Sequence, residues 1–270
     1  MLGRVLIIAG SDSGGGAGIQ ADIKTVTALD GFAMTAVTAL TVQDTQGVHG
    51  ILDVPADFVA AQMRAVLADI GADCIKIGML HRADVIEAVR AVIDSSAPGV
   101  PVVIDPVMVA KGGHPLLVPE AVATLKARLI PIATVLTPNR PEAEILAGEP
   151  QVADPERLAA ALLGLGPQAV LLKGGHVPGP TVIDVLVDRT GASETLESPR
   201  IESRNTHGTG CTLASAIAVS LAQKLPLRAA VVRARAYVRE AIMTAPGFGH
   251  GHGPLNHAHT VPRATAPLRP

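Results

Sequence analysis

The sequence of 270 residues has few aromatic side chains and few cysteines: no tryptophan, one tyrosine, three phenylalanines and two cysteines. Two cysteines are too few for a disulfide-stapled scaffold, so we expect reduced thiols and a cytoplasmic protein. The net charge of −2 supplies neither a basic face for nucleic acid nor a polybasic membrane anchor. No apolar run approaches the roughly 20 residues that cross a bilayer. We therefore expect small-molecule partners, no nucleic acid and no membrane.

What the sequence does contain is aliphatic, since 48% of its residues are hydrophobic and nearly all of these lack rings. Short apolar runs alternate with glycine-bearing turns and amphipathic stretches, which is typical of repeated strand–helix units. Such units require a mostly parallel sheet between helices, and right-handed crossovers predict a three-layer αβα sandwich. We expect one α/β domain over residues 1–259 and a disordered tail, rich in Pro, Ala and Arg, over 260–270.

The same pattern places the individual elements. Strands are predicted over 5–9, 33–41, 74–77, 102–104, 134–136 and 169–172, with an edge hairpin at 182–187 and 194–198. Helices are predicted over 18–29, 55–70, 83–93, 119–129, 141–147, 155–163, 211–223 and 227–243. In open parallel sheets ligands bind beyond the carboxyl ends of the strands, so unusual residues there are the first candidates for function.

The first candidate is the loop 10–18, which joins the first strand to the first helix and holds five glycines. It is not a P-loop, because no Gly-Lys-Ser/Thr follows, and it is neither a dinucleotide fingerprint nor a nucleophile elbow. A flexible turn is the alternative, but so many glycines favour close approach of the backbone to a ligand at a helix start. Asp22, just beyond, either faces the same pocket or is a solvated acid of the first turns.

The second candidate, Asn205-Thr-His-Gly-Thr-Gly-Cys211, opens an apolar helix. Gly208 and Gly210 expose backbone N–H groups there, which suits a transferring phosphoryl group or an oxyanion. We expect the helix terminus to lower the pKa of Cys211. The alternative is a glycine turn with a small buried cysteine. Cys74 lies inside an apolar strand and is expected to be inert core.

The third candidate set is polar and follows three other strands. Asp105 stands at one strand end, and Asn139 and Glu142 stand at the next. Carboxylate and amide oxygens are hard ligands that suit Mg²⁺. Lys173, before two glycines at a further strand end, supplies a cation suited to nucleotide phosphates. Taken singly, each of these residues could also be a helix cap or a surface charge.

Seven motifs contain these candidates. In chain order they are Gly10-Ser-Asp-Ser-Gly-Gly-Gly-Ala-Gly-Ile-Gln-Ala-Asp-Ile-Lys-Thr25, Val42-Gln-Asp-Thr45, Lys76-Ile-Gly-Met-Leu80, Asp105-Pro-Val-Met108, Thr137-Pro-Asn-Arg-Pro-Glu142, Lys173-Gly-Gly-His176 and Asn205-Thr-His-Gly-Thr-Gly-Cys211. In this order they resemble the hydroxymethylpyrimidine/phosphomethylpyrimidine kinases of thiamine biosynthesis. The resemblance covers residues 4–259, including a histidine-rich end.

The resemblance implies a ribokinase-like fold, a homodimer, and use of ATP and Mg²⁺. It implies phosphorylation of 4-amino-5-hydroxymethyl-2-methylpyrimidine, and then of its monophosphate to the diphosphate. Carried over by position, the pyrimidine would contact Gly10, Asp22, Val42, Met79 and Gln43, the last through a hydrogen bond. The catalytic anion hole would be Gly208, Gly210 and Cys211; the nucleotide would contact Asn139, Lys173 and Thr209; and the metal would lie at Asp105 and Glu142.

One departure and several alternatives stay open. Asp44 stands where the family often has Asn, and an inward-facing carboxylate would disfavour a phosphorylated substrate; we expect it to face outward. Some relatives accept pyridoxal, so pyridoxal kinase activity is a second hypothesis. A sugar kinase is disfavoured, because it should carry Asp in place of Cys211. A hydrolase with Cys211 as nucleophile and His207 as base, and a nucleotide sensor without turnover, are the rivals from other classes. The segment 250–259 is expected to be a turn or lid near the nucleotide rather than a metal site.

Overall fold

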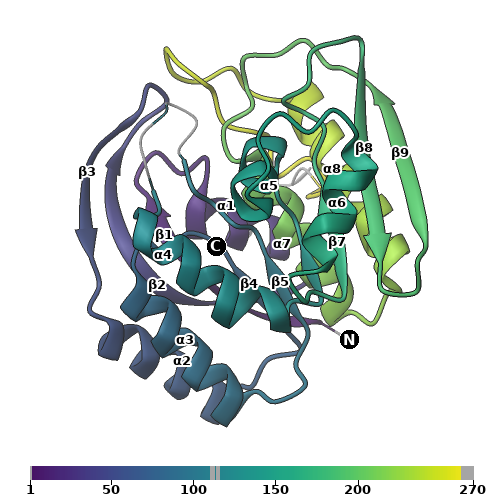
Figure 1. The fold of residues 1–270 in the computed structure, drawn as a ribbon. Helices are drawn as coiled ribbons and strands as arrows, with labels where there is room; N and C mark the ends of the chain where they lie inside the picture. The colour runs from purple at the N-terminus through teal and green to yellow at the C-terminus, as the bar shows by residue number, and fades with distance from the viewer. Residues whose placement is uncertain (1, 110–112, 114–115, 263–270) are drawn as a thin grey trace, which may run out of the picture.

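The protein is represented by a computed structural model that describes residues 2–109, 113 and 116–262. Its strands form one nine-stranded sheet in the order β3-β2-β1-β4-β5-β6-β7-β8-β9 (Figure 1). The strands are β1 (Arg4–Asp12), β2 (Phe32–Gln43), β3 (Val48–Asp53), β4 (Cys74–Ile77), β5 (Val102–Ile104), β6 (Val135–Leu136), β7 (Ala169–Leu172), β8 (Thr181–Asp188) and β9 (Ser193–Pro199). From β2 to β7 all neighbours pair parallel, and antiparallel pairs occur only at the edges of the described sheet.

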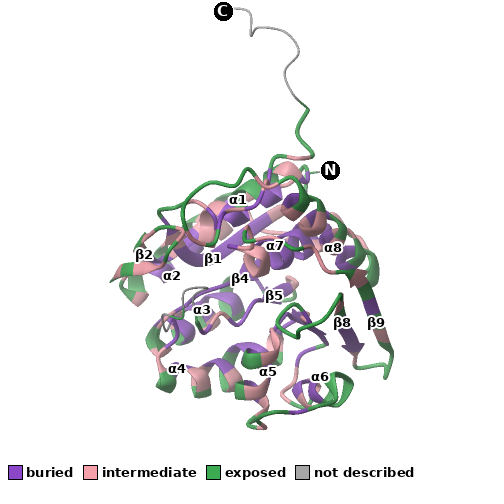
Figure 2. Cartoon of the chain, turned by 90° about the horizontal axis from the view of Figure 1, so that it is seen from above, coloured by how far each residue is buried: buried purple, intermediate pink, exposed green. Residues whose placement is uncertain are grey.

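Helices cover both faces of this sheet, and the predicted three-layer sandwich is confirmed (Figure 2). One face carries α1, α7 and α8, and the other carries α2 to α6. The helices are α1 (Gly18–Ala28), α2 (Ala56–Asp69), α3 (Ala83–Ser96), α4 (Pro119–Thr124), α5 (Arg140–Ala147), α6 (Pro155–Leu163), α7 (Thr209–Ala222) and α8 (Leu227–Met243).

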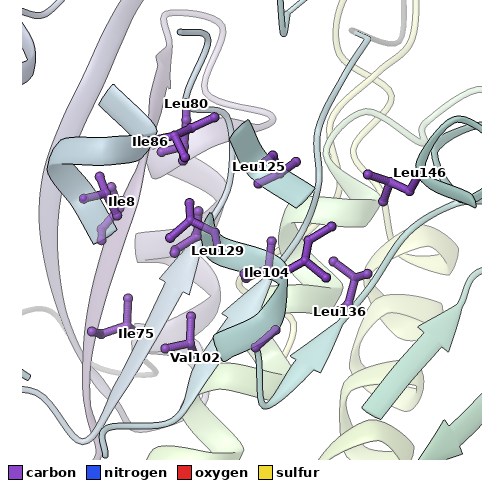
Figure 3. Close-up of a cluster of buried hydrophobic side chains, with 14 of the residues drawn as sticks. Ile8, Ile75, Leu80, Ile86, Val102, Ile104, Leu125, Leu129, Leu136 and Leu146 are labelled. Carbon is purple, nitrogen blue, oxygen red and sulfur yellow. The ribbon is translucent and has the colours of Figure 1, made fainter. Parts of the chain in front are cut away.

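Strand β1 shows why the apolar run at the N-terminus is continuous. Val5 and Ile7 pack with α7 and α8, whereas Leu6 and Ile8 pack with α2 and α3. Successive side chains of a strand point to opposite faces, so a strand between two helical layers needs an apolar residue at every position. Figure 3 shows the larger core cluster, in which Ile8, Ile75 and Ile104 of neighbouring strands meet leucines of the covering helices.

Strand β3 was not predicted. It pairs antiparallel with β2, which extends to Gln43, and the two strands form a hairpin at one edge of the sheet. Three of its residues are polar or glycine, and Leu52 is 66% exposed, so the strand lacks the continuous apolar run of the central strands. The other edge hairpin, β8–β9, was predicted and is confirmed.

Several helix boundaries differ from those expected by one to three residues, as in α3, which was predicted to end at residue 93 and ends at Ser96; two differences change the local structure. The helix predicted over 119–129 is α4 followed by a π-helical turn at Leu125–Leu129. Helix α7 begins at Thr209, two residues before the predicted start, because Gly208 forms its N-cap. Hence Thr209 and Gly210 belong to the first helical turn.

None of the described helices is both long and apolar enough to span a membrane. Of the predicted tail, residues 260–262 are described, and Thr260 donates a hydrogen bond to the carbonyl of Ala28; residues 263–270 lie outside the described residues. The carboxyl ends of the parallel strands β1, β4, β5, β6 and β7 all lie on the same side of the molecule. The candidate residues gather there.

Candidate active site

The loop after β1 is organised by one buried carboxylate, Asp12. Its oxygens accept hydrogen bonds from the backbone N–H groups of Gly14, Gly16 and Ala17 at 2.8–3.0 Å. The Nε2 atom of His207 lies 2.8 Å from Asp12 Oδ2. Burial would raise the pKa of Asp12, but the contact with His207 and the backbone donors outweigh it and lower this pKa. The glycine loop is therefore an ordered structure around an ionised acid rather than a flexible turn.

This loop interlocks with the segment before α7. Gly208 has φ +80°, and a Cβ atom placed on it would lie 1.9 Å from the carbonyl oxygen of Gly16. A Cβ atom on Gly16 would in turn lie 2.5 Å from the ring of His207. Both positions therefore exclude any side chain, because contacts this short force the backbone apart. The first and second candidate motifs form one unit.

The first half of the site, which we call the amide end, consists of Gly10, Thr41, Gln43 and Met79. A Cβ atom on Gly10 would lie 2.8 Å from Met79 Cε, so the glycine lets the methionine pack against the strand end. At the Gln43 amide, Oε1 lies 3.1 Å from Thr41 Oγ1 and Nε2 lies 3.4 Å from His207 Nε2. The neutral polar groups of Thr41 and Gln43 suit a flat, polar ring.

Val42 does not share this placement. Its side chain is 65% exposed, and it pairs across the hairpin with Gly50. The carboxylate of Asp44 accepts hydrogen bonds from the backbone of Gln46 and Gly47 and lies 3.1 Å from His49, and the residue is exposed. The predicted outward orientation of Asp44 is therefore confirmed, whereas the surroundings of Val42 give no contact with the amide end.

Asp22 lies beneath the site rather than on its surface. Its side chain is completely buried, with Lys76 Nζ 2.8 Å from Oδ2 and Ser215 Oγ 2.7 Å from Oδ1. Burial alone would lower the pKa of Lys76, but the neighbouring carboxylate of Asp22 raises it above the ordinary value, so the ammonium stays charged. This buried pair ties α1, β4 and α7 together. Lys76 was missed as a charged partner, although a lysine inside an apolar strand is a sequence signal.

The second half, which we call the charged end, consists of Asp105, Glu142, Lys173 and Gly210. Lys173 Nζ lies 2.7 Å from Asp105 Oδ1, which joins the ends of β7 and β5. A Cβ atom on Gly210 would lie 3.2 Å from both Asp105 Oδ2 and Lys173 Nζ, so the first turn of α7 rests on this ion pair. Burial raises the pKa of Glu142 to about 7; Lys173 opposes that rise and Asp105 adds to it.

Asn139 and Glu142 form the N-cap of α5. The side chain of Asn139 accepts from the backbone N–H of Glu142 at 2.9 Å, and Glu142 accepts from the backbone N–H of Asn139 at 2.8 Å. This is a capping box, whose sequence signature is Asn or Ser followed three residues later by Glu. The helix-cap alternative is therefore realised in the structure, and it places the Glu142 carboxylate beside the charged end. Thr209, expected at the nucleotide, donates to the carbonyl of Thr206 at 3.2 Å.

Cys211 corrects one expectation. Burial raises the pKa of its thiol to about 12, against the positive charge of Lys76 nearby, so the predicted lowering is wrong. Desolvation of a thiolate in this packed first turn outweighs the favourable helix terminus. At neutral pH the group is a thiol, which disfavours a cysteine nucleophile. Burial also raises the pKa of Cys74 to about 12, as befits the core position predicted for it.

The loop that follows β7 is held by residues that sequence reasoning missed. The backbone N–H of Gly174 donates to Asp184 Oδ1 at 2.8 Å, and Arg235 Nε donates to Asp184 Oδ2 at 2.8 Å. Arg200 donates to the carbonyl oxygens of Gly175, Val177 and Gly179. Arginines far along the chain therefore fix the loop next to Lys173, and no local pattern marks them.

The histidine-rich segment is hydrogen-bonded to loops next to the amide end. The backbone of residues 250–252 hydrogen-bonds Thr45 in the β2–β3 turn, and Gly253 accepts from the backbone N–H of His207 at 3.1 Å. His257 Nε2 lies 3.0 Å from Thr212 Oγ1 in α7, and burial lowers its pKa to about 4. We call residues 249–257 the strap. The strap lies at the loops of the amide end, and among described residues no cluster of three or more metal-ligating side chains is found.

The family of the chain follows from its similarity to known proteins. A family model described as phosphomethylpyrimidine kinase matches residues 12–256. A hydroxymethylpyrimidine/phosphomethylpyrimidine kinase of Bacillus subtilis is 46% identical, over 94% of both chains. A thiamine biosynthesis bifunctional protein of Geobacter sulfurreducens is 52% identical over 94% of this chain, which spans 52% of that protein's length.

Solved structures agree on the architecture. The ADP complex of Bacillus subtilis pyridoxal kinase has a TM-score of 0.87 at 34% identity, covering 96% of this chain and 98% of the other. Phosphomethylpyrimidine kinase of Clostridium difficile has a TM-score of 0.78 at 38% identity, covering 89% and 99%. The ribokinase-like fold expected from the motifs is therefore confirmed. With a family model over most of its length and near full-length relatives above 40% identity, the chain is a member of the phosphomethylpyrimidine kinase family.

Proposed function

We propose that the chain transfers the γ-phosphoryl group of ATP, with Mg²⁺, to 4-amino-5-hydroxymethyl-2-methylpyrimidine and then to the monophosphate. The observation that supports it is the placement of Gln43 at one side of the interlocked loops and of Lys173 and the α7 N-terminus at the other. The amide end suits the ring and the charged end suits phosphates. Two relatives that are 46% identical carry the name hydroxymethylpyrimidine/phosphomethylpyrimidine kinase, which covers both reactions.

Phosphoryl transfer requires positioning and neutralisation of charge more than covalent chemistry from the protein. At the start of α7 the backbone N–H of Thr209 donates to the carbonyl of Thr206 at 3.5 Å, whereas the helix itself offers no acceptor to the N–H groups of Gly210 and Cys211 in its first turn. They would stabilise the transferring group together with Lys173. Because the Cys211 thiol keeps its proton at neutral pH, its contribution is to pack the turn that presents these amides.

Asp105 and Glu142 are the residues that would hold magnesium. They lie close enough for the Asp105 charge to raise the pKa of Glu142 further, after burial, so a divalent cation between them would relieve repulsion. Mg²⁺ is usually bound by one or two carboxylates together with waters and substrate phosphates, which a set of two acids fits. When bound, the ion would supply neutralisation of the phosphate charge.

Pyridoxal is the competing substrate, since several structural neighbours are pyridoxal kinases at 33–34% identity. The identity to proteins named as pyrimidine kinases is higher, at 38–46%, which favours the pyrimidine. A Cys211 hydrolase is disfavoured by the raised pKa of the thiol.

A homodimer in the cytoplasm completes the proposal. Leu40, Val42 and Leu52 lie on one face of the β2–β3 hairpin, where they are 47%, 65% and 66% exposed, and this apolar face suits a second copy. Both cysteines are free thiols, as in a reducing compartment. Sedimentation of the purified chain tests the dimer.

The deciding experiment is a coupled assay of ADP release with the pyrimidine alcohol, its monophosphate and pyridoxal as separate substrates. We expect turnover of both pyrimidines that depends on ATP and Mg²⁺, with a kcat/KM at least tenfold above that for pyridoxal. Faster turnover of pyridoxal would replace the proposal with the pyridoxal hypothesis. Product release without ATP would replace it with a hydrolase.

A further inference from the structure

We propose that Thr41 and the pair Asp12–His207 fix the orientation of the Gln43 amide, and that this orientation makes the site selective for one order of hydrogen-bond donor and acceptor on the ligand. The inference rests on the proposed function, because it concerns the ligand at the amide end. Its basis is the position of the hydrogens on His207 and Thr41, the two neighbours of the Gln43 amide.

His207 determines one side of the amide. A carboxylate only accepts hydrogen bonds, so His207 Nε2, 2.8 Å from Asp12 Oδ2, must carry the hydrogen. That one hydrogen points at Asp12, so the Gln43 atom 3.4 Å from the same Nε2 does not receive it outright. An amide NH₂ group there would bring its hydrogens toward the N–H of His207, whereas the amide oxygen is attracted by that N–H, so the side toward His207 favours the oxygen.

Thr41 determines the other side. Its hydroxyl has one hydrogen, and Thr41 Oγ1 donates to the carbonyl oxygen of Ser11 at 2.8 Å. Toward the Gln43 atom 3.1 Å away, Thr41 Oγ1 can therefore only accept. That atom must be the amide nitrogen, which is the reverse of the placement given above, where Oε1 faces Thr41. The oxygen and nitrogen of an amide exchange places by half a turn about the last side-chain bond; Thr41 requires the turned arrangement and His207 favours it.

The fixed amide keeps one N–H hydrogen and one oxygen lone pair for a ligand, side by side. An aminopyrimidine edge matches them, since its amino group donates to the oxygen and its ring nitrogen accepts from the N–H. The 4-oxo analogue presents the reverse order, with a carbonyl oxygen beside a ring N–H. A Gln free to turn would bind either edge, whereas a Gln held by Thr41 and His207 binds one.

The test compares kcat/KM for the 4-amino alcohol and its 4-oxo analogue. We expect the native chain to prefer the amino compound at least tenfold. Thr41→Val, which removes the acceptor at nearly constant volume, should lower that preference at least threefold, while Thr41→Ser keeps it. The double variant Thr41→Val/His207→Leu should bring the ratio close to one, with its thermal unfolding measured to show that it folds.

The outcomes separate the two proposals. No turnover of the amino compound by the native chain overturns the proposed function. Turnover of both compounds at equal efficiency, or a preference that persists in Thr41→Val and in the folded double variant, overturns the fixed amide and leaves the kinase proposal standing. The KM for ATP should be the same in the native chain and in Thr41→Val, because Thr41 lies at the amide end.

Discussion

The amide end and the charged end of the site differ in their interactions: neutral hydrogen bonds surround Gln43, whereas charged side chains form the other end. Around Gln43 the contacts are hydrogen bonds among neutral side chains and backbone, and the one carboxylate nearby, Asp12, is surrounded by three N–H groups and His207. At the charged end the buried carboxylates of Asp105 and Glu142 lie within reach of the partly buried Lys173. Recognition of a flat ring requires direction, which neutral hydrogen bonds supply. Phosphate requires compensating charge held ready before the ligand binds.

A layer of buried charge also lies beneath both ends, in the pair Asp22–Lys76, and removing half of it should have the largest effect on stability. Lys76→Met leaves a carboxylate buried without its cation, so we expect the free energy of unfolding to fall by about 3–5 kcal/mol. Urea denaturation followed by circular dichroism measures it. The double variant Lys76→Met/Asp22→Leu removes both charges and should regain most of the loss. A single variant as stable as the native chain would show that the pair is dispensable.

Gly208→Ala should be the sharpest test of the interlocked loops. A methyl group there would meet the carbonyl of Gly16 at 1.9 Å, and φ +80° disfavours any side chain. Displacement of the first N–H groups of α7 should lower kcat by about 10²–10³, with a smaller change in the KM for the pyrimidine. Gly47→Ala is the matched control, because no atom lies within 4 Å of its added methyl. Retention of kcat in Gly208→Ala would remove the α7 N-terminus from the machinery.

The pH dependence of the free energy of unfolding should come from His257, which lies against α7, rather than from the amide end. The pKa of His257 is lowered to about 4 in the fold, against 6.5 as the ordinary value. The unfolded chain therefore binds the proton first as the pH falls, so stability is complete above pH 6.5 and is lost progressively down to pH 4. The loss should reach about 3 kcal/mol. Chemical denaturation at pH 7, 6 and 5 measures it, and His257→Asn should flatten the slope; an unchanged slope would contradict a neutral buried His257.

Gln43→Ala should have the smallest effect of the four and the most selective one. Loss of the amide should raise the KM for the pyrimidine about tenfold or more, since one pair of hydrogen bonds of about 1.4 kcal/mol is removed. The KM for ATP should stay within twofold, because Lys173 and its loop lie at the charged end. Steady-state kinetics with each substrate varied in turn separates the two constants. Equal changes in both would mean that the ends of the site are not independent.

Most of the fold could be predicted because a parallel sheet between two helical layers leaves a strong pattern. Every position of β1 from Val5 to Ala9 is apolar, and a glycine or a helix cap follows β1, β4, β6 and β7. The partly exposed strand β3 has no such pattern. Its identity as a strand depends on pairing with β2, which is a tertiary fact.

The candidate site, like the fold, could be predicted only in part. The motifs located both ends, and at one of their positions, Gly208, the backbone geometry requires glycine. They did not reveal which charges meet. Lys173 and Asp105 are far apart in the chain, and only the order of the strands in the sheet joins them. The pKa of Cys211 was predicted in the wrong direction because local sequence shows the helix terminus but not the depth of burial.

The strap has a consequence for how the protein is made. A chain leaves the ribosome from its N-terminus at about 5–20 residues per second, so all nine strands and the glycine loop emerge before residue 249 does. Until Gly253 reaches the backbone of His207 and residues 250–252 reach Thr45, the interlocked loops lack these contacts. A nascent chain therefore contains all nine strands before the strap can complete the site. Premature release upstream of residue 249 would yield a product with all nine strands but without the strap, and thus without its contacts with Thr45 and His207.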